Sequence, residues 1–378
     1  MPILIVALSG RSLAASARRA GAEIIVADFF GDRDTRRMAP WIRLPGSLAA
    51  GIDRRRLRAA ARALGPLDGI VYGTGFEHAP ALLCDLAALA PLIGNTPEAV
   101  TATKDPFGFA ALLSRFGLPH PAMFETPPAD GAFLCKRRGG AGGMHIRHAD
   151  GQAVAGPDRY YQAVAAGQPI SALFVANGRA ARLLGLSRQW SAPTKRAPFR
   201  YGGCVGPVAL PQPLASMIAE ACDALAASLG LVGLNSLDML IEGNDFTILE
   251  INPRPGATLD IFDMPLWEWH MRSVAGELPR FRPARRGPAR AAAILYADVA
   301  TPVPPAIRWA GWVADVPATG SLIPAGAPIC TIRAEAPDAD AAEALVRKRM
   351  AALRHRLAPP GRSPRQRRDI AQEHHAAN

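Results

Sequence analysis

The chain lacks most of the features that would assign a function at once. Its five cysteines (Cys84, Cys135, Cys204, Cys222 and Cys330) are scattered without a C-x-x-C pair, which favours neither a disulfide framework nor a zinc site. A Walker A motif is missing, and "SGRSLA" stands where a dinucleotide-binding fold would carry G-x-G-x-x-G. No apolar run approaches a membrane span, and the apolar N-terminus lacks a preceding positive region. We therefore expect a cytoplasmic protein with reduced thiols.

Acidic residues are also in deficit. Lys and Arg total 43 against 32 Asp and Glu, a net charge of +11, which raises the possibility of a nucleic-acid partner. The basic residues are mostly arginines spread along the chain, without an aromatic-interleaved stripe or a known nucleic-acid-binding motif. We expect neither a nucleic-acid nor a membrane partner. A solvated surface, or small substrates that carry phosphate, would account for the charge.

The length of 378 residues fits two or three domains rather than one core. "ILIVALSG" followed by "RSLAASARRAGAEIIVAD" predicts a strand, a helix and a second strand, which is typical of an α/β domain. "TATKDPFGFAALLSRFGLPHP" predicts one helix with Lys104 at its start. The predicted units are an N-terminal α/β domain over 1–95, a second domain over 96–280, a β-rich portion with a helix over 281–357, and a disordered tail over 358–378.

The segments "NSLDMLI" and "FTILEIN" flank "EGND" and predict a hairpin. Side chains two apart on a strand share a face, so Glu250 and Asn252 point the same way. Matching the apolar faces requires a connection with an odd number of residues, which sets Asp238 opposite Glu250. Such a cluster of oxygen donors suits Mg²⁺ bound with substrate phosphates, although a solvated polar face would look the same. Arg254 follows in the stiff turn "PRPG".

Two glycine-rich turns are candidates for ligand contact. "GAFLCKRRGGAGGMHI" predicts a strand with Lys136 and then a loop whose backbone N–H groups could approach phosphate oxygens. "DGIVYGTGFE" predicts a strand that ends in a turn at the carboxyl edge of an open sheet, where Gly73, Gly75 and Glu77 could contact substrate. Tight turns need such glycines in any case.

Lys104, the strand and loop around Lys136, and "LDMLIEGNDFTILEINPRPG" together resemble the ATP-grasp superfamily. The resemblance covers Asn95 to about Trp267 and implies an α/β fold of two lobes, preceded by a Rossmann-like pre-ATP-grasp domain. It implies two phosphate-contacting lysines, a glycine lid, an adenine hinge, a ribose contact, and ligands for two Mg²⁺ ions, with Mn²⁺ as an alternative. The lysines match Lys104 and Lys136, and the lid matches Gly139, Gly140, Gly142 and Gly143. The hinge matches Ala163 and Val164, and the ribose contact matches Gln168. The Mg²⁺ ligands match Asp238, Glu250 and Asn252.

The resemblance gives Arg254 the role of steadying the transferred phosphoryl group, and Arg188 a position that faces the substrate, although a solvated strand arginine would be equally ordinary. Gln168 and Ala163 depart from the acids that are common at their positions. The implied partners are ATP, a small carboxylate and an amine, and the resemblance allows a homodimer. The implied activity is a carboxylate–amine ligase that forms an amide through an acyl phosphate and releases ADP and phosphate.

"SGRSLAASARRAG", "FGDRDT" and "GAPICTI" further resemble ATP-grasp proteins of methylotrophic bacteria that serve the synthesis of one-carbon cofactors of the methanofuran and methylofuran type. Within that group the likeness is to tyramine–glutamate ligases, which join glutamate to an aromatic amine. Two alternatives stay open, namely a kinase or carboxylase with the same fold, and a nucleotide-binding protein without catalysis.

Overall fold

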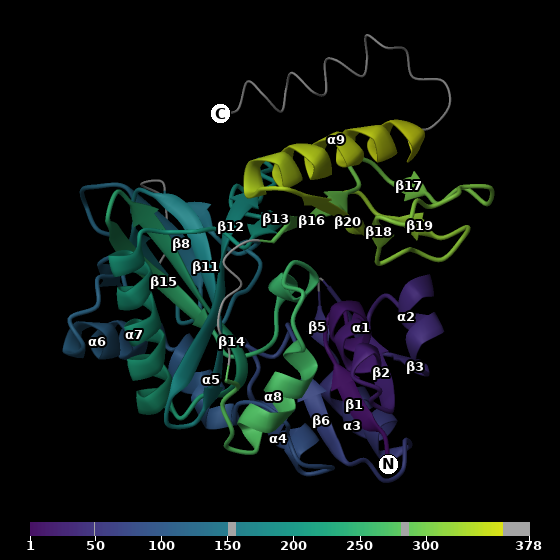
Figure 1. Cartoon of the computed structure of the whole chain (residues 1–378), viewed down its shortest axis with the longest axis horizontal. Coiled ribbons are helices and arrows are strands. Elements are labelled where there is room, and N and C mark those ends of the chain that lie inside the picture. Colours follow the sequence, from purple (N-terminus) through teal and green to yellow (C-terminus); the bar gives the residue numbers. More distant parts are fainter. Residues whose placement is uncertain (49, 150–155, 281–286, 358–378) are drawn as a thin grey trace.

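The computed structural model describes residues 1–48, 50–149, 156–280 and 287–357. The disordered tail expected over 358–378 lies outside these residues. Figure 1 shows three bodies: an N-terminal α/β domain, a central large sheet with a small sheet beside it, and C-terminal strands under a long helix. None of the helices in the described ranges is long and apolar enough to span a membrane.

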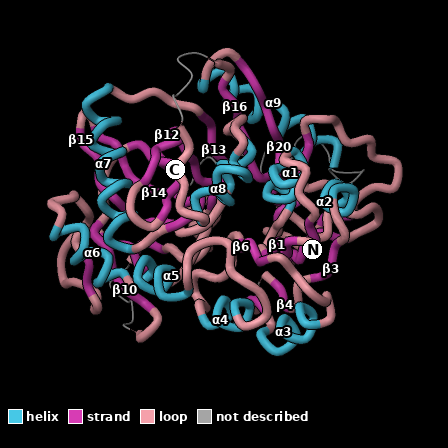
Figure 2. The backbone as a smooth tube through the Cα atoms, turned by 60° about the horizontal axis from the view of Figure 1, so that its bottom comes forward, coloured by secondary structure: helices cyan, strands magenta, loops and turns pink. Residues whose placement is uncertain are grey.

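The N-terminal domain is a parallel sheet with helices on both faces. Its strand order is β3-β2-β1-β6, and all its pairs are parallel. Helix α1 packs on one face and helices α3 and α4 on the other, as Figure 2 shows from below. The predicted N-terminal strand, helix and strand are confirmed. The elements are β1 (Ile3–Val6), α1 (Arg11–Arg19), β2 (Ile24–Asp28), α2 (Arg33–Met38), β3 (Trp41–Arg43), α3 (Arg54–Arg62), β6 (Gly69–Tyr72) and α4 (Ala81–Ala87), with a small pair β4 (Gly46–Ser47) and β5 (Gly51–Ile52).

The helix predicted around Lys104 is wrong in one respect, because two helices occupy the segment. Helix α5 (Pro97–Lys104) ends at Lys104, and α6 (Pro106–Arg115) begins two residues later. Pro106 cannot continue a helix but suits the first position of a new one, and the Asp105 side chain accepts the N–H of Phe107 as the cap. Lys104 therefore projects from the end of a helix, at the start of a sharp bend.

A small antiparallel sheet follows, with strand order β7-β10-β8-β9. Its strands are β7 (Met123–Phe124), β8 (Phe133–Arg137), β9 (Arg147–His148) and β10 (Arg159–Ala163). Lys136 lies on β8 as predicted, and the glycine-rich loop connects β8 to β9.

The large antiparallel sheet has the strand order β15-β14-β11-β12-β13-β16-β20-β18. Helix α7 (Gln212–Leu229) packs on one face, and Gly230 in the left-handed conformation ends it. Helix α8 (Leu266–Val274) and the N-terminal domain pack on the other face. The strands are β11 (Gln168–Asn177), β12 (Ala181–Ser191), β13 (Tyr201–Gly206), β14 (Val232–Glu242), β15 (Asp245–Asn252), β16 (Ala289–Tyr296), β18 (Val313–Ala314) and β20 (Pro328–Ala336).

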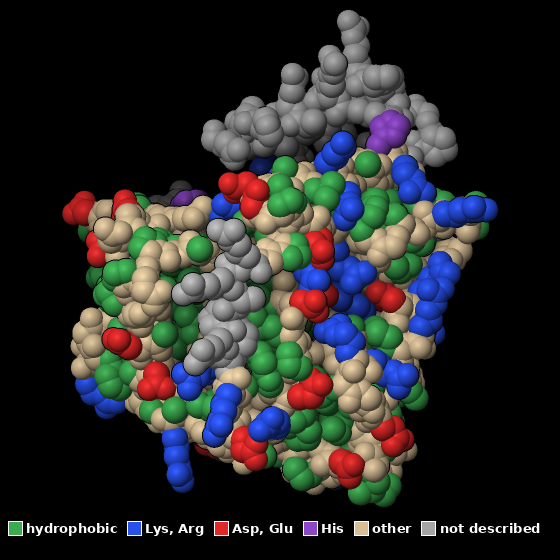
Figure 3. Space-filling view, in the orientation of Figure 1, with side chains coloured by type: hydrophobic (Ala, Val, Ile, Leu, Met, Phe, Trp, Pro, Cys, Tyr) green, Lys and Arg blue, Asp and Glu red, His purple; other side chains and the backbone are tan. Residues whose placement is uncertain are grey.

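The C-terminal strands extend this large sheet, because β16 pairs with β13 and β20 pairs with β16. The short pair β17 (Thr301–Pro302) and β19 (Leu322–Ile323) lies beside them, and α9 (Ala339–Leu357) covers them through Ala342, Val346 and Leu353. Buried ion pairs of Arg11 with Asp260 and Asp315 join the three bodies. On the face seen in Figure 3, basic and acidic side chains gather over this junction.

The hairpin of β14 and β15 sets Asp238 opposite Glu250, as predicted. The odd connection was wrong, since Glu242 pairs with Asp245 and leaves a two-residue loop. A bulge restores the parity: Met239 pairs with Ile248 while Asp238 pairs with Glu250, so Leu249 is the extra residue. The bulge lets Ile248 and Ile251 both enter the core while Glu250 faces the other side.

Candidate functional site

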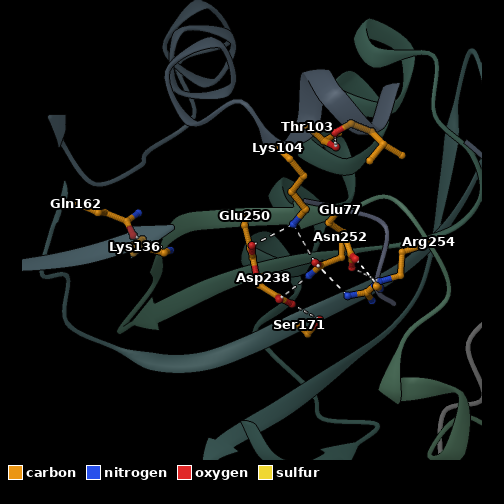
Figure 4. Close-up of polar contacts among 12 residues, drawn as sticks. Glu77, Thr103, Lys104, Lys136, Gln162, Ser171, Asp238, Glu250, Asn252 and Arg254 are labelled. Carbon is orange, nitrogen blue, oxygen red and sulfur yellow. Dashed lines mark hydrogen bonds and ion pairs between the residues drawn. The ribbon is translucent and has the colours of Figure 1, made fainter. Parts of the chain in front are cut away.

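A polar patch occupies the face of the large sheet that is turned toward the N-terminal domain. Asp238 on β14 accepts a hydrogen bond from the Ser171 hydroxyl on β11 (2.6 Å) and one from the Asn252 amide nitrogen (2.9 Å). Gln189 on β12 donates to the same carboxylate at 3.4 Å. Figure 4 shows Asp238, Glu250 and Asn252 side by side with Lys104 above them. Three strands therefore hold the Asp238 carboxylate in one orientation.

Lys104 contacts two of the predicted metal ligands. Its Nζ lies 3.1 Å from Glu250 Oε2 and 3.0 Å from Asn252 Oδ1. Burial favours the neutral form of Glu250, but Lys104 and Lys136 outweigh it and lower the pKa of Glu250. Burial and the charge of Glu250 raise the pKa of Asp238. The lysine cation thus stabilises the negative charge on Glu250 at the end of the hairpin.

The donor set fits a hard divalent cation. The Lys104 ammonium shows that Glu250 and Asn252 already hold a positive charge between their oxygens. Within the described ranges no group of three His, Cys, Asp or Glu converges as a self-sufficient metal cluster. Two carboxylates and one amide are instead what Mg²⁺ uses when substrate phosphates complete its shell. The side-chain amide of Asn252 points its nitrogen toward Asp238. The amide would therefore have to rotate before its oxygen could bind a cation beside Asp238.

Lys136 approaches the same patch from the small sheet. It is 5% exposed, and its Nζ donates to Gln162 Oε1 at 2.9 Å. Burial lowers its pKa, while the charges of Glu250 and Asp238 act in the opposite direction. Gln162 was not singled out from the sequence, although it lies one residue before the end of β10 and pairs there with Leu134 of β8.

The glycine loop packs against both neighbouring bodies. A Cβ at Gly139 would lie 2.6 Å from Glu77 O and His78 Cα in the N-terminal domain, and one at Gly143 would lie 1.8 Å from Phe199 O. Both have positive φ, and Tyr201 N donates to Gly142 O. Gly140 leaves room for the His145 ring, because a Cβ at Gly140 would lie 2.3–2.4 Å from three atoms of that ring. Gly139, Gly140 and Gly143 therefore need to be glycine for the loop to pack this closely against its neighbours.

Arg254 forms a buried ion pair with Glu77. Its Nε donates to Glu77 Oε1 at 2.7 Å, and its Nη2 lies 3.4 Å from Asn252 Oδ1. The Arg254 and Glu77 side chains are 9% and 2% exposed. The sequence pointed to each residue separately, with Glu77 as a substrate contact, but gave no sign that they pair across 177 positions.

Arg188 does not face the patch. It pairs across β11 with Ile170, whereas Ser187 pairs with Ser171, so alternation puts Arg188 on the opposite face from Asp238. There it forms ion pairs with Asp340 (2.7 Å) and Glu343 (2.9 Å) of α9. The expectation that Arg188 faces substrate is corrected by this geometry.

The predicted nucleotide hinge is only partly compatible with the contacts. The N–H groups of Ala163 and Val164 already donate to Ala122 O and Ala132 O. Val164 is 46% exposed. Gln168 lines a groove of about 500 Å³ with Arg188 and α9, away from Asp238. The patch therefore unites Lys104, Lys136, Asp238, Glu250, Asn252 and Arg254, but not Gln168 or Arg188.

Comparison with known proteins agrees with the architecture. Residues 104–258 match a family described as an ATP-grasp domain, a range that begins at Lys104 and includes Arg254. No curated protein matches the sequence. The chain has the ATP-grasp fold with mixed α/β content.

Three solved structures illustrate the likeness in fold. Pyruvate carboxylase of Rhizobium etli has a TM-score of 0.72 at 13% identity over 92% of this chain, which spans only 37% of that longer chain. The biotin carboxylase domain of Hydrogenobacter thermophilus 2-oxoglutarate carboxylase, a dimer in complex with MgADP, ADP and bicarbonate, has 0.70 at 14% identity, covering 91% of this chain and 88% of that one. The L-amino acid ligase of Bacillus licheniformis has 0.66 at 14%, covering 92% and 96%.

Proposed function

We propose that the protein is an ATP-dependent carboxylate–amine ligase that activates a carboxylate as an acyl phosphate and transfers it to an amine. The observation that carries this proposal is the convergence of two carboxylates, two lysines and one arginine at one face of the large sheet. The glycine loop packs against the adjoining backbone of Glu77 and His78. Phosphoryl transfer needs positioning and charge neutralisation more than a protein nucleophile, and this set supplies both.

Each group of residues in the patch has its own role in the proposed reaction. Lys104 and Lys136 would bind phosphate oxygens, and Lys104 would leave Glu250 to do so. Asp238, Glu250 and Asn252 would hold Mg²⁺, which when bound neutralises phosphate charge and orients the phosphates. Arg254 would stabilise charge on the transferred group. The loop from Gly139 to Gly143 would keep water from the acyl phosphate.

The finer proposal concerns the substrates. Glutamate with an aromatic amine such as tyramine is the pair that the sequence resemblance favours, in the synthesis of a one-carbon cofactor. Ligases and carboxylases both occur among proteins of this fold, so the product distinguishes the candidates.

The experiment is ADP release from Mg-ATP with a panel of amino acids, each with and without tyramine, followed by mass spectrometry. A ligase gives ADP only when both partners are present, together with an amide. ADP that requires bicarbonate, or a phosphorylated product, would reject the ligase in favour of a carboxylase or a kinase. Tight ATP binding without any turnover would support a binding protein.

A further inference from the structure

Glu77 is a buried acid in a part of the chain that carries none of the other groups of the site. It lies five residues after the end of β6, in the glycine turn of the N-terminal domain. One carboxylate oxygen accepts the N–H of Gly75 at 2.7 Å, and the other accepts Arg254 Nε at 2.7 Å. Both oxygens are therefore occupied by protein donors, so Glu77 is not arranged to contact substrate.

The bonds of Arg254 leave one end of its guanidinium for a ligand. Nε is bonded to Glu77 and Nη2 approaches Asn252, while no hydrogen bond is recorded for Nη1 among the described residues. A Cβ at Gly256 would lie 2.7 Å from Nη1, so glycine keeps this end uncovered. The planar fork is thus anchored at Nε and open at Nη1.

The backbone before Arg254 is anchored to the same domain. The Asn95 amide donates to Pro253 O at 2.9 Å, and the Tyr72 hydroxyl lies 3.4 Å from the same oxygen. Tyr72 and Asn95, like Glu77, belong to the first 95 residues of the chain. The position of Arg254 therefore depends on how that domain is docked.

Burial distinguishes this pair from an ordinary surface bridge. With side-chain exposures of 9% and 2%, neither charge is well solvated, so each side chain compensates the other for the lost contact with water. Burial opposes ionisation of Glu77, but Arg254 and Lys104 prevail, so its pKa is lowered. A neutral residue at position 77 would keep a similar shape but would no longer fix the guanidinium by charge.

We propose that Glu77 is a positioning residue that orients Arg254 so that Nη1 meets the phosphoryl oxygens of the reacting substrate. The inference rests on the proposed function for the identity of that substrate. The N-terminal domain thereby contributes to the chemistry of the sheet face through one ion pair. Because Gly139 packs against the Glu77 and His78 backbone, closure of the glycine loop meets the same segment.

A purely structural role is the competing explanation, and the chain offers a matched control. Asp260 pairs with the buried Arg11 and also joins the N-terminal domain to the rest of the chain, and among the described residues its side-chain hydrogen bonds are to Arg11 rather than to the patch. We would compare Glu77→Gln, Glu77→Asp, Arg254→Lys, the double variant Glu77→Gln/Arg254→Lys, and Asp260→Asn in the full chain.

The expected result is a fall of about tenfold to a hundredfold in kcat for Glu77→Gln, the range of a lost hydrogen bond to a charged group. The KM for ATP should change less than about threefold, because Arg254 acts on the reacting group. The double variant should be no slower than Arg254→Lys, since Glu77 acts through Arg254. Asp260→Asn should lower the midpoint of thermal unfolding without this loss of kcat.

A binding measurement keeps the inference testable if no substrate pair turns over. Orthovanadate with MgADP imitates a phosphoryl group in transfer, and calorimetry should show it about tenfold weaker in Glu77→Gln, with MgADP alone unchanged. That result without turnover would support the positioning role while the proposed ligase fails. Equal effects in Glu77→Gln and Asp260→Asn, additive losses in the double variant, or no binding of vanadate by the wild type would overturn the inference. Glu77→Asp, which keeps the charge but is one methylene shorter, serves if Glu77→Gln does not fold.

Discussion

His270 makes the stability of the protein depend on pH in a way that can be calculated. It lies on α8, where its Nδ1 accepts the N–H of Leu234 (3.0 Å) and its Nε2 lies 2.9 Å from Ile93 O. Since an amide N–H only donates and a carbonyl only accepts, the ring must be neutral with its proton on Nε2. Protonation of Nδ1 would set two donors against each other beside β14, the strand of Asp238.

Burial lowers the pKa of His270 from 6.5 to about 4. Above pH 6.5 both the folded and unfolded states carry neutral histidine, so the stability from this site is fully present. Between pH 6.5 and 4 only the unfolded state takes up the proton, and the free energy of unfolding falls as the pH falls. A difference of two and a half pKa units amounts to about 3 kcal/mol, all of which is lost below pH 4.

The assay is urea unfolding of the wild type and of His270→Gln at several values between pH 7.5 and 4. Glutamine can accept from Leu234 and donate to Ile93 but does not titrate, and every other group cancels in the difference. The stability advantage of the wild type should shrink by about 3 kcal/mol as the pH falls. Parallel curves for the two proteins would refute the reasoning.

Three further predictions concern the site. Glu250→Gln should reduce Mg-dependent turnover by at least about a hundredfold with an unchanged circular dichroism spectrum. Glu242→Gln, at the exposed end of the same hairpin, should not reduce turnover. Equal activities of the two variants would contradict the metal assignment. Arg188→Met should keep turnover within about twofold and lower the free energy of unfolding by about 1 kcal/mol or less, because its partners are on α9; a large loss of kcat would restore Arg188 to the substrate side. Gly143→Ala should raise the KM for ATP about tenfold more than Gly142→Ala does. Both glycines have positive φ, but only a Cβ at Gly143 would meet the Phe199 carbonyl. Equal KM values for the two variants would show that the loop does not close at Phe199.

Local patterns in the sequence were sufficient for the elements that carry the site. Alternation along "LDMLI" and "TILEIN" predicted that Asp238 and Glu250 share a face, and the pairing confirms it. The glycines after Lys136 predicted a loop that approaches other groups closely, and Gly139 and Gly143 do so. The odd connection was wrong because a bulge at Leu249 changes the parity, and periodicity cannot distinguish a bulge from a longer loop.

The placement of Arg188 could not be read from its own strand. Alternation shows that residues 187 and 188 face opposite ways, but it does not show which face is covered by the helix that carries Glu343, 155 residues later. The acids of α9 decide it, because they offer Arg188 two carboxylates on the far side of the sheet.

The sequence by itself determined the strands, the turns and the kinds of side chain on each face, because backbone sterics and hydrophobic alternation act over a few residues. Only the tertiary structure decided that Glu77 meets Arg254 and that Lys104 meets Glu250. Those pairs join segments separated by 177 and 146 positions, and they form only when separate bodies dock through their apolar faces. Docking depends on the shape of whole surfaces, which no local pattern specifies.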